Sequence, residues 1–568
     1  MKKILSIVMF VLLLTFVQAQ DIIQEGHLKL LAVREIGGGF QGSTADLYLE
    51  IRPGSGRVFL DTFPLTKTDT QISTRFAKEV ACSFLNKDCS SFDFVYTIKA
   101  DSSIIAGPSA GAATAALTVL LLGGIPVNES VAITGTINSG GLVGHVGGVK
   151  EKIDAGAAAG LKKILIPQGE QLIDSRNRTI NIVEIENEKG IEIREVATLN
   201  EVLYELTGKK LKPEGKELVV DENYTTIMGS LALDLCNRSE KLQGMIEGVN
   251  QSLLEEPYNL TERGSAAFET GSYYSAASYC FGANVKLSEL YMMSRNFSDL
   301  KIRESIEQVR NNIGNIQKRI DAKAVRTITD IEAYASVKER LLDADKYLTL
   351  ALGNLNDSHR AIADLAYASE RVYSAVSWYK FFQHIGKELD LSNTALKESC
   401  QEKIGEAEER FQYVEILLPS FLQNTQEEIN YAYSYLNSED YELCLFKASL
   451  AKAQADIVLN LVGLNLNESK EQLDIKLGVV KESIIRETEL GIFPVIAYSY
   501  YEYANSLKET DLSSALLYSE YALELSNLDL YFYQPQEKVI FAANPDLGIF
   551  IIGIAAGLIL SLFIRKRS

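Results

Sequence analysis

The composition of the chain changes near residue 208, and this change limits the possible folds more than any other feature. Residues 23–208 are rich in Gly, Ala, Val and Ile and mix strand and helix patterns, whereas residues 210–540 contain few Gly or Pro and many Glu, Lys, Leu, Ala and Tyr. Apolar side chains recur every three or four residues from Ile302 to Ile320, which is typical of a buried helix seam. We therefore expect an α+β domain at 23–208, followed by a long all-α region of helical hairpins or repeats at 210–540.

Local patterns predict the main elements of the first region. Residues 27–35 and 45–62 have the pattern of strands, with a Pro-Gly-Ser-Gly turn inside the second segment. Residues 109–122 are small and apolar on every side, which predicts a helix that is buried all round. Residues 150–159 form a second expected helix, which ends at Gly160.

The two ends of the chain are strongly apolar and predict a membrane topology. Residues 1–19 combine two lysines, an apolar stretch and a final small residue, which is the pattern of a signal peptide. Residues 547–564 carry no charge and are long enough for a transmembrane helix, and a basic cytoplasmic tail at 565–568 would follow. The sequence thus predicts a single-pass cell-membrane protein with its bulk outside the cell.

Cysteines and glycosylation sequons are consistent with an oxidising, external location. The six cysteines could form three disulfides, and the spacing favours the pairs Cys82–Cys89, Cys236–Cys280 and Cys400–Cys444, with buried free thiols as the alternative. Five of the Asn-x-Ser/Thr sequons cluster in one stretch and predict a glycosylated surface. They are Asn223, Asn237, Asn250, Asn259 and Asn296.

Charge and composition argue against several classes of function. There are 56 basic and 75 acidic residues, giving a net charge of −19, so nucleic acid is not an expected partner. The chain has only four histidines and contains neither HExxH nor CxxC. No metal site and no cofactor are therefore expected.

The motif Gly-Pro-Ser-Ala-Gly at residues 107–111 offers a candidate nucleophile. Ser109 would open the buried helix, where free backbone N–H groups and the helix dipole favour a developing oxyanion. The motif also fits the G-x-S-x-G turn of α/β-hydrolases, which would require a histidine as base. Only His145 follows the serine within this region, so the hydrolase interpretation is the weaker one.

A lysine in an apolar pocket is the other group able to accept a serine proton. Desolvation can lower a lysine pKa from about 10.4 toward about 7–8, where the neutral amine becomes a usable base. Lys150 and Lys152 both lie near the start of the second helix. Periodicity does not choose between them, and either could simply be a solvated helix end.

Several linked motifs resemble one peptidase family. They are GPSAG (107–111), GIPV (124–127), VAITGTI (131–137) and GGLVGHVGGVKEKIDAGAAAGLKKILIP (140–167). Their order resembles that of the proteolytic domain of Lon proteases, which are Ser–Lys peptidases of family S16. As a whole, the chain is similar to archaeal secreted or membrane-bound Lon-like serine proteases that lack the AAA+ ATPase.

The resemblance assigns roles to particular residues. It implies that Ser109 is the nucleophile, that Lys152 is the general base and that Thr134 hydrogen-bonds the lysine. It further implies an oxyanion hole formed by the backbone N–H groups of Ser109 and Ala110. The implied activity is that of a membrane-tethered serine endopeptidase acting on unfolded or peptide substrates, with a homo-oligomeric ring as an expected assembly.

Three departures from the family pattern leave an alternative open. Ala106 stands where the family usually has an aspartate before the serine motif, and Thr136 replaces an acidic residue. The sequence also contains no GxxxxGK[ST] nucleotide-binding motif. The peptidase would therefore be ATP-independent. The alternative is a catalytically inactive Lon-like domain in a cell-surface binding or scaffold protein.

Overall fold

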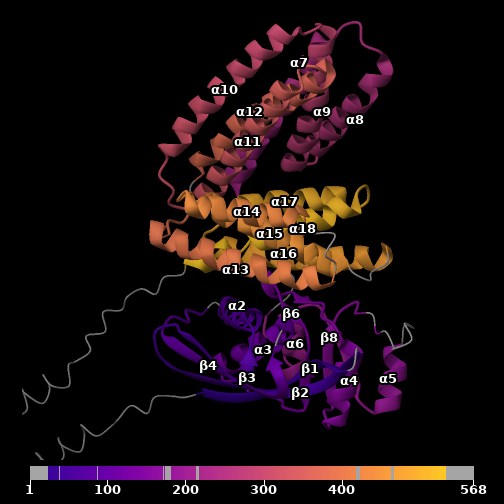
Figure 1. Ribbon diagram of the computed structural model, residues 1–568, viewed down its shortest axis with the longest axis vertical. Coiled ribbons are helices and arrows are strands. Elements are labelled where there is room, and N and C mark those ends of the chain that lie inside the picture. Colours follow the sequence, from indigo (N-terminus) through magenta and orange to yellow (C-terminus); the bar gives the residue numbers. More distant parts are fainter. Residues whose placement is uncertain are drawn as a thin grey trace, which may run out of the picture. The chain divides into compact units, whose positions relative to one another are not determined.

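A computed structural model describes residues 24–532, with gaps at 37–38, 86, 106, 171, 173–180, 213–215, 385, 390, 418–422 and 462–465. Up to about residue 208 these residues form a mixed α/β region, and beyond it they form helices (Figure 1). The predicted order of an α+β domain followed by an all-α region is therefore confirmed for the part of the chain that the structure describes.

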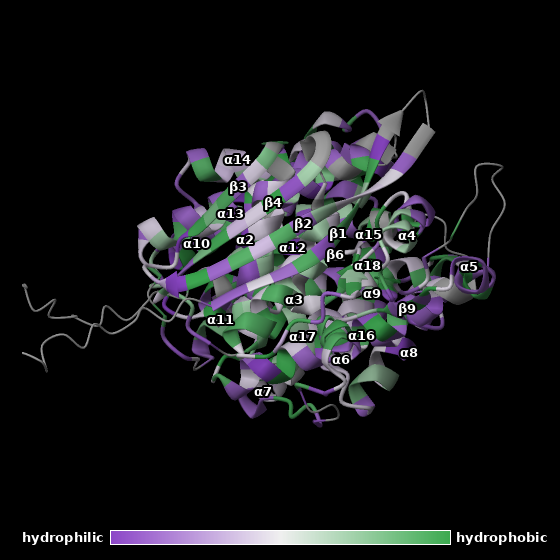
Figure 2. Ribbon diagram, turned by 90° about the horizontal axis from the view of Figure 1, so that it is seen from below, coloured by the Kyte–Doolittle hydropathy of each residue, from purple (hydrophilic) through white to green (hydrophobic). Residues whose placement is uncertain are grey.

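A seven-stranded sheet organises the α/β region, with the strand order β3-β4-β2-β1-β5-β8-β9. The strands are β1 (Gln24–Ile36), β2 (Gly39–Pro53), β3 (Val58–Thr66), β4 (Phe92–Ile105), β5 (Val131–Ile133), β8 (Lys163–Pro167) and β9 (Glu192–Val196). β1 pairs antiparallel with β2 and parallel with β5, and β5, β8 and β9 continue in parallel. Hydrophobic and polar residues alternate along the long strands (Figure 2), as expected where one face of a sheet is covered.

Short strands and helices complete this region. A second, two-stranded sheet contains β6 (Thr136–Ile137) and β7 (Val143–Gly144). The helices are α2 (Thr68–Phe84), α3 (Gly111–Leu122), α4 (Val149–Ala158), α5 (Ile182–Lys189) and α6 (Leu199–Thr207), with 3-10 turns η1 (Pro108–Ala110) and η2 (Ser139–Gly141). Every residue of α3 is buried, which confirms the expectation drawn from its uniformly small and apolar sequence.

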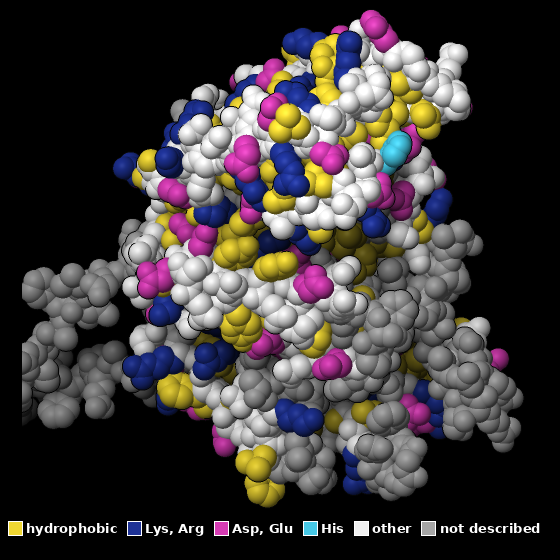
Figure 3. Space-filling model, turned by 45° about the horizontal axis from the view of Figure 1, so that its top comes forward, with side chains coloured by type: hydrophobic (Ala, Val, Ile, Leu, Met, Phe, Trp, Pro, Cys, Tyr) yellow, Lys and Arg dark blue, Asp and Glu magenta, His cyan; other side chains and the backbone are white. Residues whose placement is uncertain are grey.

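The second region is built from antiparallel helices. They are α7 (Glu222–Met245), α8 (Gln251–Glu269), α9 (Tyr273–Ser294), α10 (Asp299–Asp321), α11 (Ile328–Gly353), α12 (Ser358–Trp378), α13 (Asn393–Leu417), α14 (Gln423–Asn437), α15 (Tyr441–Leu461), α16 (Leu466–Glu489), α17 (Val495–Leu507) and α18 (Leu512–Leu525). The isoleucine seam predicted between Ile302 and Ile320 lies on α10, and both of these side chains are buried. On the face shown in Figure 3, basic side chains lie among acidic ones, as is typical of a solvated surface.

The cysteines are joined in the pairs that their spacing favours. The structure contains the disulfides Cys82–Cys89, Cys236–Cys280 and Cys400–Cys444. The first closes the connection between α2 and β4, while the other two join α7 to α9 and α13 to α15. The five clustered sequon asparagines are all exposed, and their glycosylation remains a prediction.

The predicted C-terminal transmembrane helix and single-pass membrane location require correction. None of the helices formed by the described residues is long and apolar enough to cross a membrane. The uniformly apolar helix α3 has 12 residues, about 18 Å of helix against a hydrocarbon core of about 30 Å, and it is enclosed by its own domain. The predicted segments 1–19, 547–564 and 565–568 lie outside the described residues. The described residues thus form a mixed α/β region followed by an all-helical region, and the predicted transmembrane helix and membrane location have no support among them.

Candidate active site

Ser109 lies in the tight connection between β4 and α3. It is half-buried within η1, and α3 begins two residues later at Gly111. Gly107 has a φ of +99°, which side-chain-bearing residues rarely adopt. A Cβ on Gly111 would lie 2.9 Å from the backbone nitrogen of Ile137, so the last glycine of the motif lets β6 approach the turn. The serine is thus placed at the start of a buried helix, as the motif predicted.

Backbone hydrogen bonds tie the serine turn to the segment that contains Thr134. The Gly135 N–H donates to the Ser109 carbonyl (3.0 Å), and the Ala112 N–H donates to the Gly135 carbonyl (3.1 Å). Thr134 is fully buried, and its Oγ1 has no hydrogen-bond partner among the described residues. A buried hydroxyl without a partner is costly, so this oxygen has capacity for a further hydrogen bond.

The helix α4 holds Lys152 inside the domain. A Cβ on Gly42 of β2 would lie 1.8 Å from the Glu151 carbonyl oxygen, which shows how closely α4 packs on the sheet. Lys152 is only 2% exposed. Burial lowers its pKa to about 8, and the nearby charge of Glu170 opposes this shift. The lysine is therefore partly neutral near physiological pH.

The two candidate lysines occupy different environments. The Lys150 ammonium pairs with the Asp154 carboxylate at 2.7 Å, and 28% of its side chain is exposed. Lys150 is therefore a surface ion pair of the kind that contributes little, whereas Lys152 is buried. Of the two, only Lys152 has the desolvated environment that a lysine base needs.

Glu170 is a charged residue near Lys152 that the sequence patterns did not identify. Its Oε2 lies 3.0 Å from Nδ1 of His145 and 3.5 Å from the backbone nitrogen of Val146. His145, the histidine that follows Ser109 in this region, thus contacts Glu170. Glu170 follows β8 by three residues, and this position past the carboxyl end of a parallel strand was the one available signal.

The positions at which the chain departs from the family pattern are only partly described. Thr136 is buried in β6, so its replacement of an acidic residue falls next to the segment that contacts the serine turn. Ala106 lies outside the described residues.

Comparison with known proteins identifies the same part of the chain. Residues 98–208 match the model of the Lon protease (S16) C-terminal proteolytic domain. This segment is similar to Lon proteases. The Lon-like domain therefore contains the serine turn, α4 and Glu170, while the helices from α7 onward lie outside the match.

Individual relatives agree with this similarity. The chain is 36% identical over 120 residues to an archaeal Lon protease of Archaeoglobus fulgidus, covering 21% of this chain and 18% of the relative. It is 35% identical over 138 residues to an archaeal Lon protease of Methanothermobacter thermautotrophicus, covering 24% and 20%. A Lon protease of Azorhizobium caulinodans is 46% identical over 81 residues, covering 14% and 10%. The chain thus spans at most a fifth of the length of these relatives.

Proposed function

We propose that the protein is an ATP-independent serine endopeptidase in which Ser109 is the nucleophile and Lys152 the general base. The observation that carries this proposal is the burial of Lys152, with a pKa of about 8, in a domain similar to Lon proteolytic domains. A base with a pKa near the operating pH is the most effective proton acceptor. The dyad, the oxyanion hole and the role of Thr134 all belong to the proposal.

The proposed reaction is an acyl transfer in two stages. Neutral Lys152 accepts the proton of the Ser109 hydroxyl while Oγ attacks the scissile carbonyl carbon. The backbone N–H groups of Ser109 and Ala110 stabilise the oxyanion, because the first N–H groups of a helix lack intrahelical partners. Lysine then protonates the leaving amine as the C–N bond breaks. Water, deprotonated by the same lysine, hydrolyses the resulting ester and regenerates both side chains.

The surroundings of Lys152 support its proposed role as the general base. The Oγ1 of Thr134, for which the described residues provide no hydrogen-bond partner, would accept a hydrogen bond from the lysine amine and hold it toward the serine turn. Glu170 contributes negative charge that favours the ammonium form, which assists transfer of the serine proton to the lysine.

The substrate class follows from the absence of an unfolding motor in this sequence. The chain contains no GxxxxGK[ST] motif, and we therefore propose that it cleaves polypeptides that are already extended. A homo-oligomeric ring, implied by the family resemblance, stays a prediction.

The test is the cleavage of an unfolded protein by the purified full chain in the absence of ATP. Ser109→Ala and Lys152→Met should each abolish cleavage. Lys150→Met is the matched control, since it removes a lysine two residues away that is paired at the surface, and it should cleave at a rate close to that of the wild type. Cleavage that persists in Ser109→Ala, or equal losses in the two lysine variants, would refute the proposal.

A further inference from the structure

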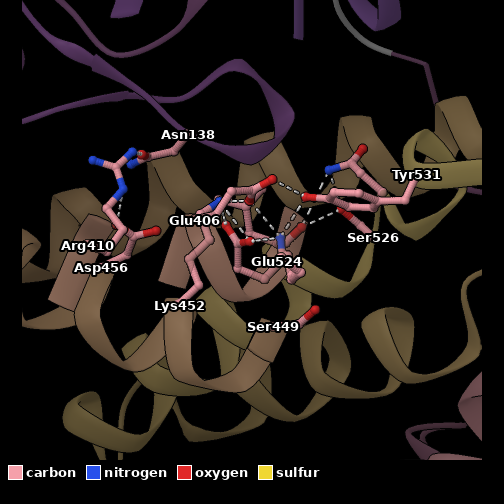
Figure 4. Close-up of polar contacts among 12 residues, drawn as sticks. Asn138, Glu406, Arg410, Ser449, Lys452, Asp456, Glu524, Ser526 and Tyr531 are labelled. Carbon is pink, nitrogen blue, oxygen red and sulfur yellow. Dashed lines mark hydrogen bonds and ion pairs between the residues drawn. The ribbon is translucent and has the colours of Figure 1, made fainter. Parts of the chain in front are cut away.

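The helical region contacts the Lon-like domain through a buried arginine. Arg410 of α13 is 4% exposed. Its Nη2 donates to the Ile137 carbonyl oxygen at 3.2 Å and to Oδ1 of Asn138. Its Nε lies 3.1 Å from Oδ1 of Asp456 on α15. Figure 4 shows the guanidinium between Asn138 on one side and Asp456 on the other.

The Ile137 carbonyl that Arg410 contacts belongs to a segment that is hydrogen-bonded to the serine turn. Ile137 ends β6, which starts immediately after Gly135. The Gly135 N–H donates to the Ser109 carbonyl, and the backbone nitrogen of Ile137 lies 2.9 Å from the position of a Cβ on Gly111. A short hydrogen-bonded path therefore runs from the helical region through β6 to Ser109.

Further contacts join the following loop to other helices of the helical region. Gly140 of η2 lies so close to α16 and α18 that a Cβ would be 2.8 Å from Val479 and 2.9 Å from Leu523. The Lys452 ammonium lies 4.5 Å from the ring centroid of Phe76 on α2. Residues 137–140 thus contact α13, α16 and α18 of the helical region.

Further buried ion pairs lie close to Asp456, the carboxylate partner of Arg410. Lys452 pairs with the buried Glu524 at 2.9 Å, and Lys476 pairs with the buried Glu520. These carboxylates, which lie close to Asp456, already have ammonium partners and leave no reason to place a metal ion among them. Burying a charged pair costs free energy, and its best-attested benefit is that it fixes one arrangement of the parts it joins.

We propose that Arg410 is a positioning residue of the peptidase site: it holds β6 and Asn138 so that the serine turn keeps its reactive geometry. This inference rests on the proposed function. It assigns the helical region a part in catalysis. Arginine suits the task because its rigid planar guanidinium reaches two acceptors and a carboxylate at once, which a lysine ammonium does with less geometric control.

The experiment compares Arg410→Gln and Arg410→Lys with a matched control in the full chain. The control is Arg238→Gln, because Arg238, which is partly exposed, also pairs with a buried carboxylate, that of Glu370, at 2.6 Å for each of two hydrogen bonds. This pair joins α7 to α12, away from the Lon-like domain (Figure 1). Three quantities are measured for each variant: the rate of Ser109 modification by a serine-reactive phosphonate, kcat and KM on a peptide, and hydrogen exchange of residues 134–144.

A small misplacement of a reacting group costs up to about 10²-fold in rate. We expect Arg410→Gln to lower the modification rate and kcat at least about tenfold with little change in KM. Arg410→Lys should recover part of this loss, and residues 134–144 should exchange faster in Arg410→Gln but not in Arg238→Gln. If Arg410→Gln does not fold, Asn138→Ala, which removes one acceptor without stranding a charge, should show the same effects in weaker form.

Each outcome decides the inference separately from the proposed function. If hydrogen exchange at residues 134–144 is unchanged in Arg410→Gln, Arg410 does not hold β6 and Asn138 in place, whatever the activity of the variant. Faster exchange with an unchanged modification rate overturns the positioning role, and so do equal losses in Arg238→Gln. Cleavage that survives Ser109→Ala refutes the proposed function instead, and the exchange measurement still tests the contact.

Discussion

Replacing Lys152 with Met should stabilise the protein at neutral pH while abolishing its activity. The folded protein holds this lysine at a pKa of about 8, against an ordinary value of 10.5. Because each pKa unit corresponds to about 1.4 kcal/mol, keeping the buried ammonium charged costs about 3 kcal/mol below pH 8. Methionine has a similar shape and no charge, so the variant should recover most of that free energy.

The pH dependence of this gain identifies its cause. The cost is fully present below pH 8, where the lysine is charged in both states. It shrinks as the folded-state lysine loses its proton and disappears above the ordinary pKa of 10.5. The advantage of Lys152→Met in urea unfolding should therefore fall from about 3 kcal/mol at pH 7 to about 1 kcal/mol at pH 10.

The control for this comparison is Lys150→Met. Lys150 belongs to a partly exposed ion pair, so its loss should change the free energy of unfolding by less than about 1 kcal/mol. A Lys152→Met variant that is less stable than the wild type at pH 7, or whose gain is the same at pH 10, would refute the reasoning.

Three further predictions concern the chemistry of the site. The rate of peptide cleavage should rise with pH through an inflection near pH 8, since Lys152 acts as a base only when neutral; a rate that is flat from pH 6 to 9 would contradict this. Glu170→Gln removes a charge that raises the Lys152 pKa, so the inflection should move to lower pH, and a move to higher pH would exclude the assigned role. Thr134→Val removes a hydroxyl that has no hydrogen-bond partner in the described part of the chain, so kcat should fall at least about tenfold while the urea midpoint does not decrease. An unchanged kcat would show that the hydroxyl does not hydrogen-bond the lysine during catalysis.

Much of the α/β region could be predicted because its signals are local. Residues 109–122 are uniformly small and apolar, which predicts a helix buried on all sides, and α3 is such a helix. The serine motif could be placed at the start of that helix for the same reason. The change in composition near residue 208 predicted the boundary between the strands and the long helices, because a glycine-poor sequence with helical periodicity favours helices.

The rest depends on contacts between distant parts of the chain. Arg410 and Asn138 are 272 residues apart, and no periodicity marks either of them as a partner of the other. Lys150 and Lys152 could not be distinguished by pattern because both open the same helix, and only the packing of α4 on β2 decides which is buried. The membrane prediction relied on segments that lie outside the described residues, and no described helix supports it.

The most direct test of the central claim is the pH dependence of Ser109 modification by a serine-reactive phosphonate, with the modified residue mapped by mass spectrometry. A nucleophile activated by buried Lys152 predicts modification at Ser109 in the wild type, a rate that rises through pH 8, and no measurable modification in Lys152→Met. Failure of the wild type to react at Ser109, or equal rates in Lys152→Met, would contradict the claim and would favour an inactive Lon-like domain.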